Sequence, residues 1–212
     1  MIATKRARVH AWDSGEYKAD QLSEEFVEFR LVYEGPLESG ANNPRPKEKH
    51  AIRKALHRQL AALWAHDAGL QELVRSPGLE KIANDYARCG YRFAPVVSSR
   101  LKLVCALDIL FLRRESPGQL VQHGGDIDGR LKTLFDALCI PVSCNQLPSP
   151  EPGEDPFFCL LEDDHLITGF QITTDQLLRP SRSDEAPNDV VLIIHVKVKA
   201  TMITIANIGL TT

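Results

Sequence analysis

The chain contains no long hydrophobic run. None of its apolar stretches reaches the roughly 18–20 residues that a membrane-spanning helix needs. The first six residues, Met-Ile-Ala-Thr-Lys-Arg, also lack the apolar core of a secretory signal. We therefore expect a cytoplasmic protein with no membrane partner.

Cysteine is scarce, and its five copies are scattered along the chain. No two of them stand in the Cys-x-x-Cys spacing of zinc and redox sites. The pattern predicts reduced thiols that mostly fill the core, rather than a disulfide framework or a zinc site. The five are Cys89, Cys105, Cys139, Cys144 and Cys159.

Positive charge is not in excess. The net charge of −3 argues against an obligate nucleic-acid binder, because such domains are commonly basic. Basic residues nevertheless gather between Arg45 and Arg58, whereas acids concentrate at 20–28 and 151–164. The basic stretch is either a phosphate-contacting helix or simply a solvated helix face. With two arginines further along, the candidate nucleic-acid contacts are Lys47, Lys49, Arg53, Lys54, Arg58, Arg113 and Arg114.

The hydrophobic periodicity predicts a mixed α/β fold in which a mixed β-sheet packs against helices. We expect an N-terminal arm at 1–25 and a single domain over 26–212. A segment at 142–156 holds four prolines and is expected to be a mobile surface loop. The expected strands are 26–33, 101–112, 157–161, 166–173 and 190–205, with 157–161 and 166–173 returning through one sheet; the expected helices are 47–68, 79–89 and a segment that begins at Asp128 and ends before Pro141.

The most informative segment runs from Asp126 to Leu138. Asp126 and Asp128 stand one residue apart before an expected amphipathic helix, for which Asp128 is a good N-cap. Asp128, Lys132 and Asp136 are spaced at i, i+4 and i+8 and therefore lie along one helix face. The apolar stripe of the same helix comprises Leu131, Leu134, Phe135 and Leu138.

A second acidic pair, Asp163 and Asp164, opens a later expected strand. Gathered carboxylates repel one another unless a hard cation sits between them. The two acidic motifs therefore predict a magnesium-type oxygen site and point to phosphodiester chemistry. His165 beside the pair is either a further ligand or general base, or a solvent-facing polar residue.

These motifs resemble the RusA-type Holliday junction resolvases, of which the chain would be a divergent member. That family carries an Asp-x-Asp-Asn-x-x-Lys-x-x-x-Asp-Ala-Leu signature followed by an Asp-Asp pair. The signature stands here as Asp126-Ile-Asp128-Gly129-Arg-Leu-Lys132-Thr-Leu-Phe-Asp136-Ala-Leu, and the pair as Asp163-Asp164. The order of strands and helices over 26–205 is also similar.

The resemblance implies a Mg²⁺-dependent endonuclease that acts as a homodimer on branched DNA, with Mn²⁺ as a possible substitute. By the same resemblance, Asp126, Asp128 and Asp164 hold the metal and Lys132 is needed for cleavage. Asp163 and Asp136 would support these ligands. The physical roles agree, because a carboxylate-bound Mg²⁺ can activate water and a nearby lysine can stabilise the developing charge.

Two alternatives stay open. A catalytically silent module could keep the RusA-like fold and bind nucleic acid or a partner without cutting; Gly129, which replaces the signature asparagine, and the acidic balance favour it. Alternatively, the 142–156 loop docks a protein partner, and the chain is one subunit of a larger complex.

Overall fold

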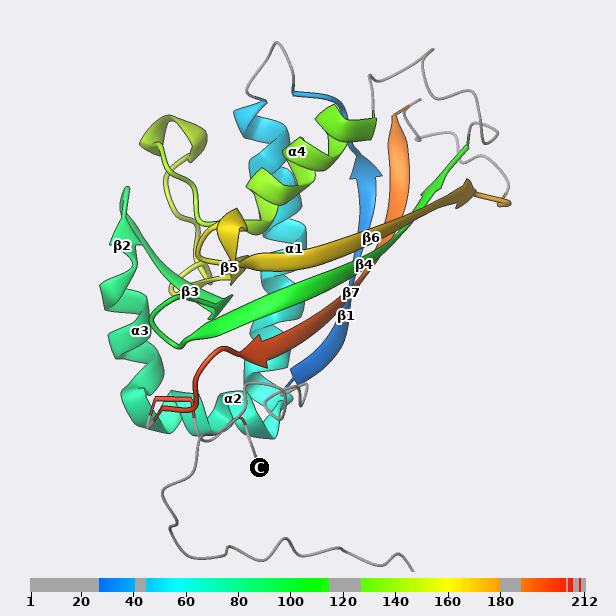
Figure 1. The fold of residues 1–212 in the computed structure, drawn as a ribbon. Coiled ribbons are helices and arrows are strands. Elements are labelled where there is room, and N and C mark those ends of the chain that lie inside the picture. The colour runs from blue at the N-terminus through cyan, green and yellow to red at the C-terminus, as the bar shows by residue number, and fades with distance from the viewer. Residues whose placement is uncertain are drawn as a thin grey trace, which may run out of the picture.

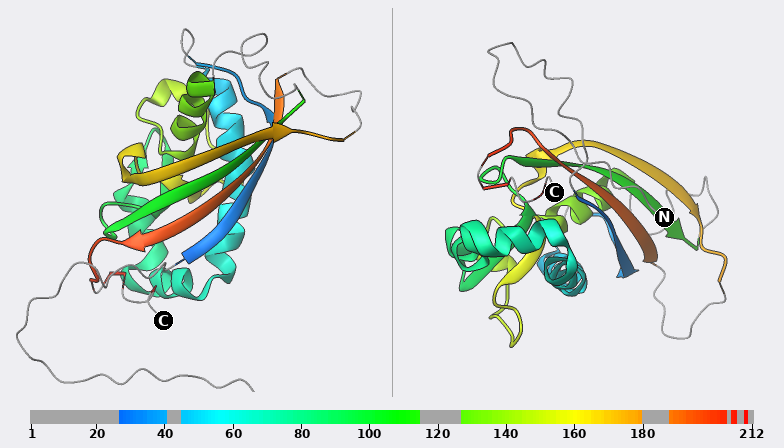
Figure 2. Two further views of the ribbon diagram at one scale, coloured as in Figure 1. Left: turned by 45° about the vertical axis from the view of Figure 1, so that its right-hand side comes forward. Right: turned by 90° about the horizontal axis from the view of Figure 1, so that it is seen from below.

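The computed structural model describes residues 27–40, 45–114, 127–179, 188–204, 206–207 and 210. The expected N-terminal arm and Asp126 lie outside these ranges. The described residues form a mixed α/β fold, as the sequence predicts, with helices gathered on one face of a four-stranded sheet (Figure 1 and Figure 2).

The four-stranded sheet has the order β1-β7-β4-β6 and is mixed. β7 pairs antiparallel with both β1 and β4, whereas β4 and β6 run parallel. The strands are β1 (Val27–Pro36), β4 (Leu103–Arg113), β6 (Ile167–Gln176) and β7 (Asp189–Ala200). β4 and β7 bury every second residue, which places one row of side chains against the helices and the next row on the opposite face.

Helix α1 (Pro46–His66) is the longest described element. Proline at its first position suits a helix start, because its missing N–H has no intrahelical partner there. The helix buries Ile52, Leu56, Leu60 and Trp64 in the core. The chain continues through α2 (Ala68–Leu73), the π-helical turn η2 (Val74–Gly78) and α3 (Leu79–Asp85). None of the helices in the described ranges is long and apolar enough to cross a membrane.

A second sheet of three short strands, β2 (Ala87–Arg88), β3 (Tyr91–Val97) and β5 (Phe157–Leu161), has the order β2-β3-β5. β3 and β5 run parallel, and β5 packs on α1 while β3 packs on α3. The expectation that 157–161 and 166–173 return through one sheet is therefore wrong. Residues 157–161 pair with β3, which the sequence did not predict as a strand.

Helix α4 (Ile127–Leu138) carries the acidic motif. It begins at Ile127, so Asp128 lies inside the first turn and is not the N-cap that we expected. A carboxylate in the first turn still interacts favourably with the positive end of the helix dipole. Two short 3-10 turns, η3 (Cys144–Gln146) and η4 (Asp164–Leu166), follow along the chain.

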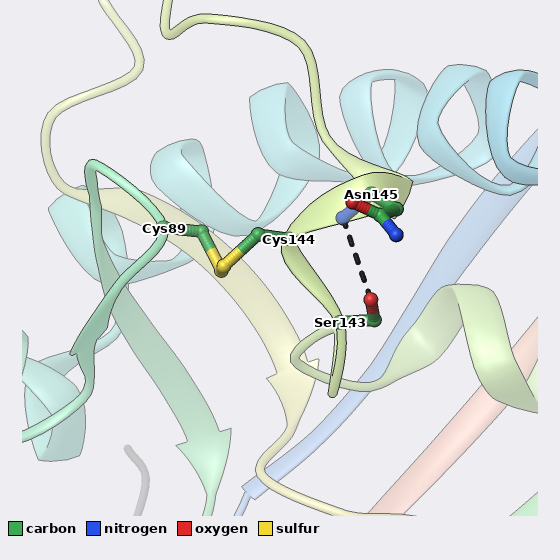
Figure 3. The surroundings of a disulfide bond; sticks show 4 residues. All are labelled: Cys89, Ser143, Cys144 and Asn145. Carbon is green, nitrogen blue, oxygen red and sulfur yellow. Dashed lines mark hydrogen bonds between the residues drawn. A yellow bond between two sulfur atoms is a disulfide. The ribbon is translucent and has the colours of Figure 1, made fainter.

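The prediction that all five cysteines are reduced thiols is wrong for two of them. Cys89, in the turn after β2, forms a disulfide with Cys144 of η3 (Figure 3). The two lie 55 residues apart in the sequence, and only folding brings them together. Cys105, Cys139 and Cys159 are free and buried, as expected of core thiols.

The proline-rich segment 142–156 is fastened at a second place. Glu154 is buried, and its Oε1 lies 3.1 Å from Nζ of Lys54 on α1. His57 Nε2 lies 3.2 Å from the Gly153 carbonyl oxygen, and Arg92 bonds Asp155 at 2.7 Å. The expected mobile loop is thus held by the disulfide at one end and by α1 and β3 at the other.

Candidate functional site

The end of α4 and the end of β5 are joined by main-chain bonds. Ile140 donates its N–H to the carbonyl oxygen of Leu161 at 3.0 Å, and Cys139 forms a parallel bridge with the same residue. This contact carries the acidic pair that follows β5 to the C-terminal end of α4. Two motifs that are about 25 residues apart in the sequence therefore meet at one place.

An open hollow of about 170 Å³ lies at this meeting point. Three carboxylates face it, from Asp136 on α4 and from Asp163 and Asp164 at η4. Its remaining described lining consists of Cys139, Ile140 and Val142. Asp136 and the Asp163–Asp164 pair therefore lie around one hollow in the structure.

Asp136 is bound from α1 by a buried lysine. Nζ of Lys49 lies 2.6 Å from Oδ2 of Asp136, and Lys49 is only 7% exposed. Arg53, one turn further along α1, donates to the main-chain oxygens of Asp136 at 2.7 Å and Cys139 at 3.3 Å. The carbonyls at the end of α4 would otherwise lack partners, so Arg53 closes this helix end from the side.

The Asp163 carboxylate is fixed in place by His165. Its Oδ1 lies 2.7 Å from His165 Nδ1 and accepts the His165 main-chain N–H at 3.2 Å. These hydrogen bonds, the side-chain bond first, lower the pKa of Asp163, and a hydrogen bond with the Asp164 side chain lowers it further. Asp163 is thus an ionised, oriented oxygen donor beside Asp164.

The pKa of the Cys139 thiol is affected by the negative charges around the hollow. Burial is the main reason that its pKa is raised well above its usual value, and the carboxylates of Asp164, Asp163 and Asp136 raise it further. Burial and these charges therefore both favour the protonated thiol, which is a weak nucleophile. The oxygen donors around it are carboxylates, the ligand type that Mg²⁺ and Mn²⁺ prefer.

Glu162 belongs to the acidic run but serves a different contact. Its Oε2 accepts the Tyr86 hydroxyl at 3.0 Å and the Ser99 N–H at 2.7 Å. These bonds tie the end of β5 to the ends of α3 and β3. Glu162 is therefore an anchor for the pair that follows it, and it is not among the residues that line the hollow.

Asp128 and Lys132 lie on α4 but outside the hollow. Both are exposed, and at a rise of about 1.5 Å per residue they stand about 12 and 6 Å along the axis from Asp136. Within the described ranges, no three His, Cys, Asp or Glu side chains form a group that could hold one metal ion. The expected ligand set of Asp126, Asp128 and Asp164 includes a residue outside those ranges, and it stays a prediction.

Ser39 lies so close to the main chain at Gly129 that a larger residue there would collide with it. A Cβ atom at this position would meet Ser39 Oγ and would lie 2.9 Å from Ser39 Cβ. The chain that leaves β1 therefore passes directly against the first turn of α4. The asparagine of the resolvase signature has no room in this arrangement.

The basic stretch on α1 is mostly engaged within the protein. Lys49 and Arg53 are buried against α4, and Lys54 bonds Glu151 at 2.6 Å as well as Glu154. Among the expected phosphate contacts on this helix, Lys47 and Arg58 are the exposed ones. Arg113 is buried at the end of β4, and Arg114 donates to the Arg179 carbonyl oxygen at 3.2 Å. These seven candidate contacts therefore do not lie together on one exposed surface, and their role in binding nucleic acid stays a prediction.

Sequence reasoning did not identify Cys139 and Ile140 as part of the site. Their signal was their position directly after Asp136-Ala-Leu, where α4 ends and the chain turns toward β5. Lys49 was assigned to the surface because a lysine on a basic helix is usually solvated. Its true partner is 87 residues away, beyond the reach of any local pattern.

Searches of protein-family models, of curated proteins and of solved structures find no match to this chain.

Proposed function

We propose that the protein is a Mg²⁺-dependent endonuclease that cleaves phosphodiester bonds in branched DNA, with Mn²⁺ as a substitute metal. The observation that carries the proposal is the convergence of Asp136, Asp163 and Asp164 on one hollow, at the end of the helix that also presents Asp128 and Lys132. The resemblance to RusA-type resolvases supports it through the same residues.

In this proposal, the side chains around the hollow have different roles. Asp164 and Asp163 supply the oxygen donors of the hollow, and His165 keeps Asp163 ionised and oriented. When bound there, Mg²⁺ would supply activation of water and neutralisation of the phosphate charge. Asp136 completes the acidic wall while Lys49 holds it in place.

Lys132 and Asp128 flank the hollow along α4. Lys132 is exposed about one turn from Asp136, where its ammonium group can contact a phosphate that lies across the hollow. Asp128 stands one turn further, outside the hollow and two residues after Asp126; the resemblance assigns both to metal binding with Asp164, and the Asp128→Asn variant below tests that assignment. Exposed Lys47 and Arg58 are the remaining candidates on α1 for contacts to the DNA backbone.

The proposal includes a homodimer that presents two sites to a branched substrate, a cytoplasmic location and a role in DNA recombination or repair. Two coupled sites would suit paired cuts at a junction. These parts rest on the resemblance and on the absence of a long apolar run, and each is independent of the cleavage chemistry.

The decisive experiment is cleavage of labelled four-way junction, flap and linear duplex DNA in Mg²⁺, Mn²⁺ or chelator. The wild-type protein is compared with Asp164→Asn and Asp128→Asn, which remove a charge and keep the shape. Asp108→Asn is the matched control, because Asp108 is exposed on the opposite face of the sheet. We expect metal-dependent cleavage that falls by at least about 100-fold in both site variants and is unchanged in the control.

The ranking of substrates then decides the specificity. Preference for the four-way junction supports a resolvase, and preference for flaps or nicked duplex supports another structure-selective nuclease. Cleavage that survives chelator or the Asp164→Asn change would contradict the proposed site.

The catalytically silent alternative has one structural observation in its favour. Ser39 leaves no room at Gly129 for the signature asparagine, so that part of the family site cannot be present in this geometry. In this alternative, junction DNA or a protein partner binds without cleavage, and Asp164→Asn leaves binding unchanged. Deletion of 142–156 would abolish partner binding if that loop is the docking segment.

A further inference from the structure

Arg113 is a buried arginine to which the described part of the chain supplies no ion-pair partner. It is the last residue of β4 and only 5% exposed, and its Nη2 is fully covered without a hydrogen-bond partner. Its side chain makes no ion pair or hydrogen bond with any other residue that the structure describes. The other basic side chains near the core differ, because Lys49 meets a carboxylate and Arg53 meets two carbonyl oxygens.

The alternation of the strands separates Arg113 from the acids at the same end of the sheet. β4 buries Ile109, Phe111 and Arg113 on the helix-facing side. Asp175 pairs with Leu112, whose side chain lies on the face of the sheet away from the helices. By the same alternation, Asp189 on β7 and Glu34 on β1 also lie on that face. The main-chain oxygen of Arg113 is already used by Leu177 N–H. The acids on these described strand ends therefore lie on the opposite face of the sheet from the Arg113 guanidinium.

A guanidinium stays charged at any physiological pH, so burial cannot be relieved by loss of a proton. Holding such a charge away from water without a partner is strongly unfavourable. The fork of N–H donors matches the oxygens of phosphate in two parallel bonds, which an ammonium group does not. The strand partners of this stretch on the same face, Thr174 opposite Phe111 and Gln176 opposite Arg113, are polar side chains that suit a hydrated anion.

We propose that Arg113 anchors a binding site for a phosphate group at the end of the four-stranded sheet. The phosphate comes either from a small phosphorylated ligand or from the backbone of a nucleic acid. The second source rests on the proposed function, whereas the first does not.

The test measures the Tm of the full chain in chloride and in inorganic phosphate at constant ionic strength. Arg113→Met removes the charge and keeps the length of the side chain, and Arg88→Met is the matched control because Arg88 is exposed on β2. We expect phosphate to raise the Tm of the wild type and of the control in a saturable manner. Arg113→Met should lose this rise and, in chloride, should be at least as stable as the wild type, because an unpaired buried charge has been removed.

Arg113→Lys keeps the charge without the fork and should weaken the apparent phosphate affinity about tenfold. A wild type that does not respond to phosphate, or an Arg113→Met variant that still responds, would overturn the site. A large loss of Tm for Arg113→Met in chloride, with no phosphate response in Arg113→Lys, would show instead that Arg113 is a structural residue.

A second arm identifies the source of the phosphate. Fluorescence anisotropy with a labelled junction should show that Arg113→Met weakens binding about tenfold and lowers the salt slope by about one, if the phosphate belongs to DNA. Unchanged DNA binding with a retained phosphate response assigns a small phosphorylated ligand. Asp164→Asn should keep the phosphate response in either case, so failure of the nuclease proposal and failure of this one are distinguishable.

Discussion

Lys49 and Asp136 form an ion pair that joins α1 to the end of α4, with Nζ 2.6 Å from Oδ2. The lysine is nearly inaccessible, whereas the carboxylate keeps one side open to the hollow that Asp163 and Asp164 share. Lys49 on α1 therefore fixes the position of the Asp136 carboxylate on α4, one of the three acids that line the hollow.

Replacing Lys49 should show how much the Lys49–Asp136 ion pair contributes to stability. Lys49→Met leaves the Asp136 carboxylate facing two other acids without its cation, and we expect a loss of about 1–3 kcal/mol in the free energy of unfolding. Urea unfolding measures it. Combining Lys49→Met with Asp136→Asn should recover part of the loss, because the unpaired charge is gone; strict additivity of the two changes would argue against a direct pair.

At Gly129 the structure predicts the sign of a stability change, namely whether replacement by alanine stabilises or destabilises the protein. An exposed glycine within a helix normally gains about 0.5–1 kcal/mol on substitution by alanine. We expect Gly129→Ala to lose about 1–3 kcal/mol instead, because its methyl group would lie against Ser39. Thermal unfolding measures it, and adding Ser39→Gly should restore stability. Gly169→Ala is the control, since nothing lies within 4 Å of its Cβ position; a gain at Gly129 would mean that the close approach is absent.

Two buried histidines should make the protein sensitive to mild acid. Burial is the main cause that lowers the pKa of His50 and of His57 below 6.5. His57 Nδ1 accepts the Phe158 N–H at 2.9 Å, a bond that protonation would break. The unfolded chain therefore binds more protons than the folded one below about pH 6.5, so stability should fall as the pH drops from 7.5 to 5.5.

Urea unfolding at these two pH values checks the prediction. His50→Phe keeps a ring beside Phe157 and Tyr91 and removes one titrating group. We expect it to flatten the pH dependence with little loss at pH 7.5, since the ring nitrogens of His50 make no hydrogen bond. His66→Gln, at an exposed position at the end of α1, is the control variant. An unchanged slope in His50→Phe would remove His50 from the explanation.

The Cys89–Cys144 disulfide should hold the first part of the proline-rich segment. Closing a loop of 55 residues stabilises by about 2–4 kcal/mol, mainly by restricting the unfolded chain. Upon reduction, or in Cys89→Ser, we expect faster hydrogen exchange around η3 and little change near Glu154, which Lys54 retains. Alkylation before reduction should modify neither cysteine; labelling of Cys144 in the untreated protein would show that the bond is not formed.

Local patterns predicted those elements whose burial is periodic. The apolar stripe of α4 and the strict alternation of β4 reflect one buried face each, and both elements lie close to their expected bounds. β3 was not predicted because it is buried at nearly every residue and contains Pro95. Its sequence therefore shows neither the two-residue alternation of a half-buried strand nor the 3.6-residue repeat of a helix. The pairing of β5 with β3 joins strands about 60 residues apart and follows from packing on α1 and α3 rather than from either segment alone.

The acidic motifs were found from sequence because their chemistry is local, but their partners were not. Lys49 and Arg53 look like surface residues until α4 supplies a carboxylate and two carbonyl oxygens to them. The same limit applies to Cys89 and Cys144, which no spacing rule connects. Tertiary contacts decide which polar residue is buried, and they leave little trace in the local sequence.

The edge of β1 carries a further consequence. Gln59 of α1 accepts the Val32 N–H at 2.9 Å and donates to the Val32 carbonyl oxygen at 2.6 Å, so the side chain behaves like a short piece of neighbouring strand. A strand from another molecule would have to displace this amide before it could extend the sheet beyond β1. The β1 edge of the four-stranded sheet therefore has part of its hydrogen-bonding capacity already used from within the molecule.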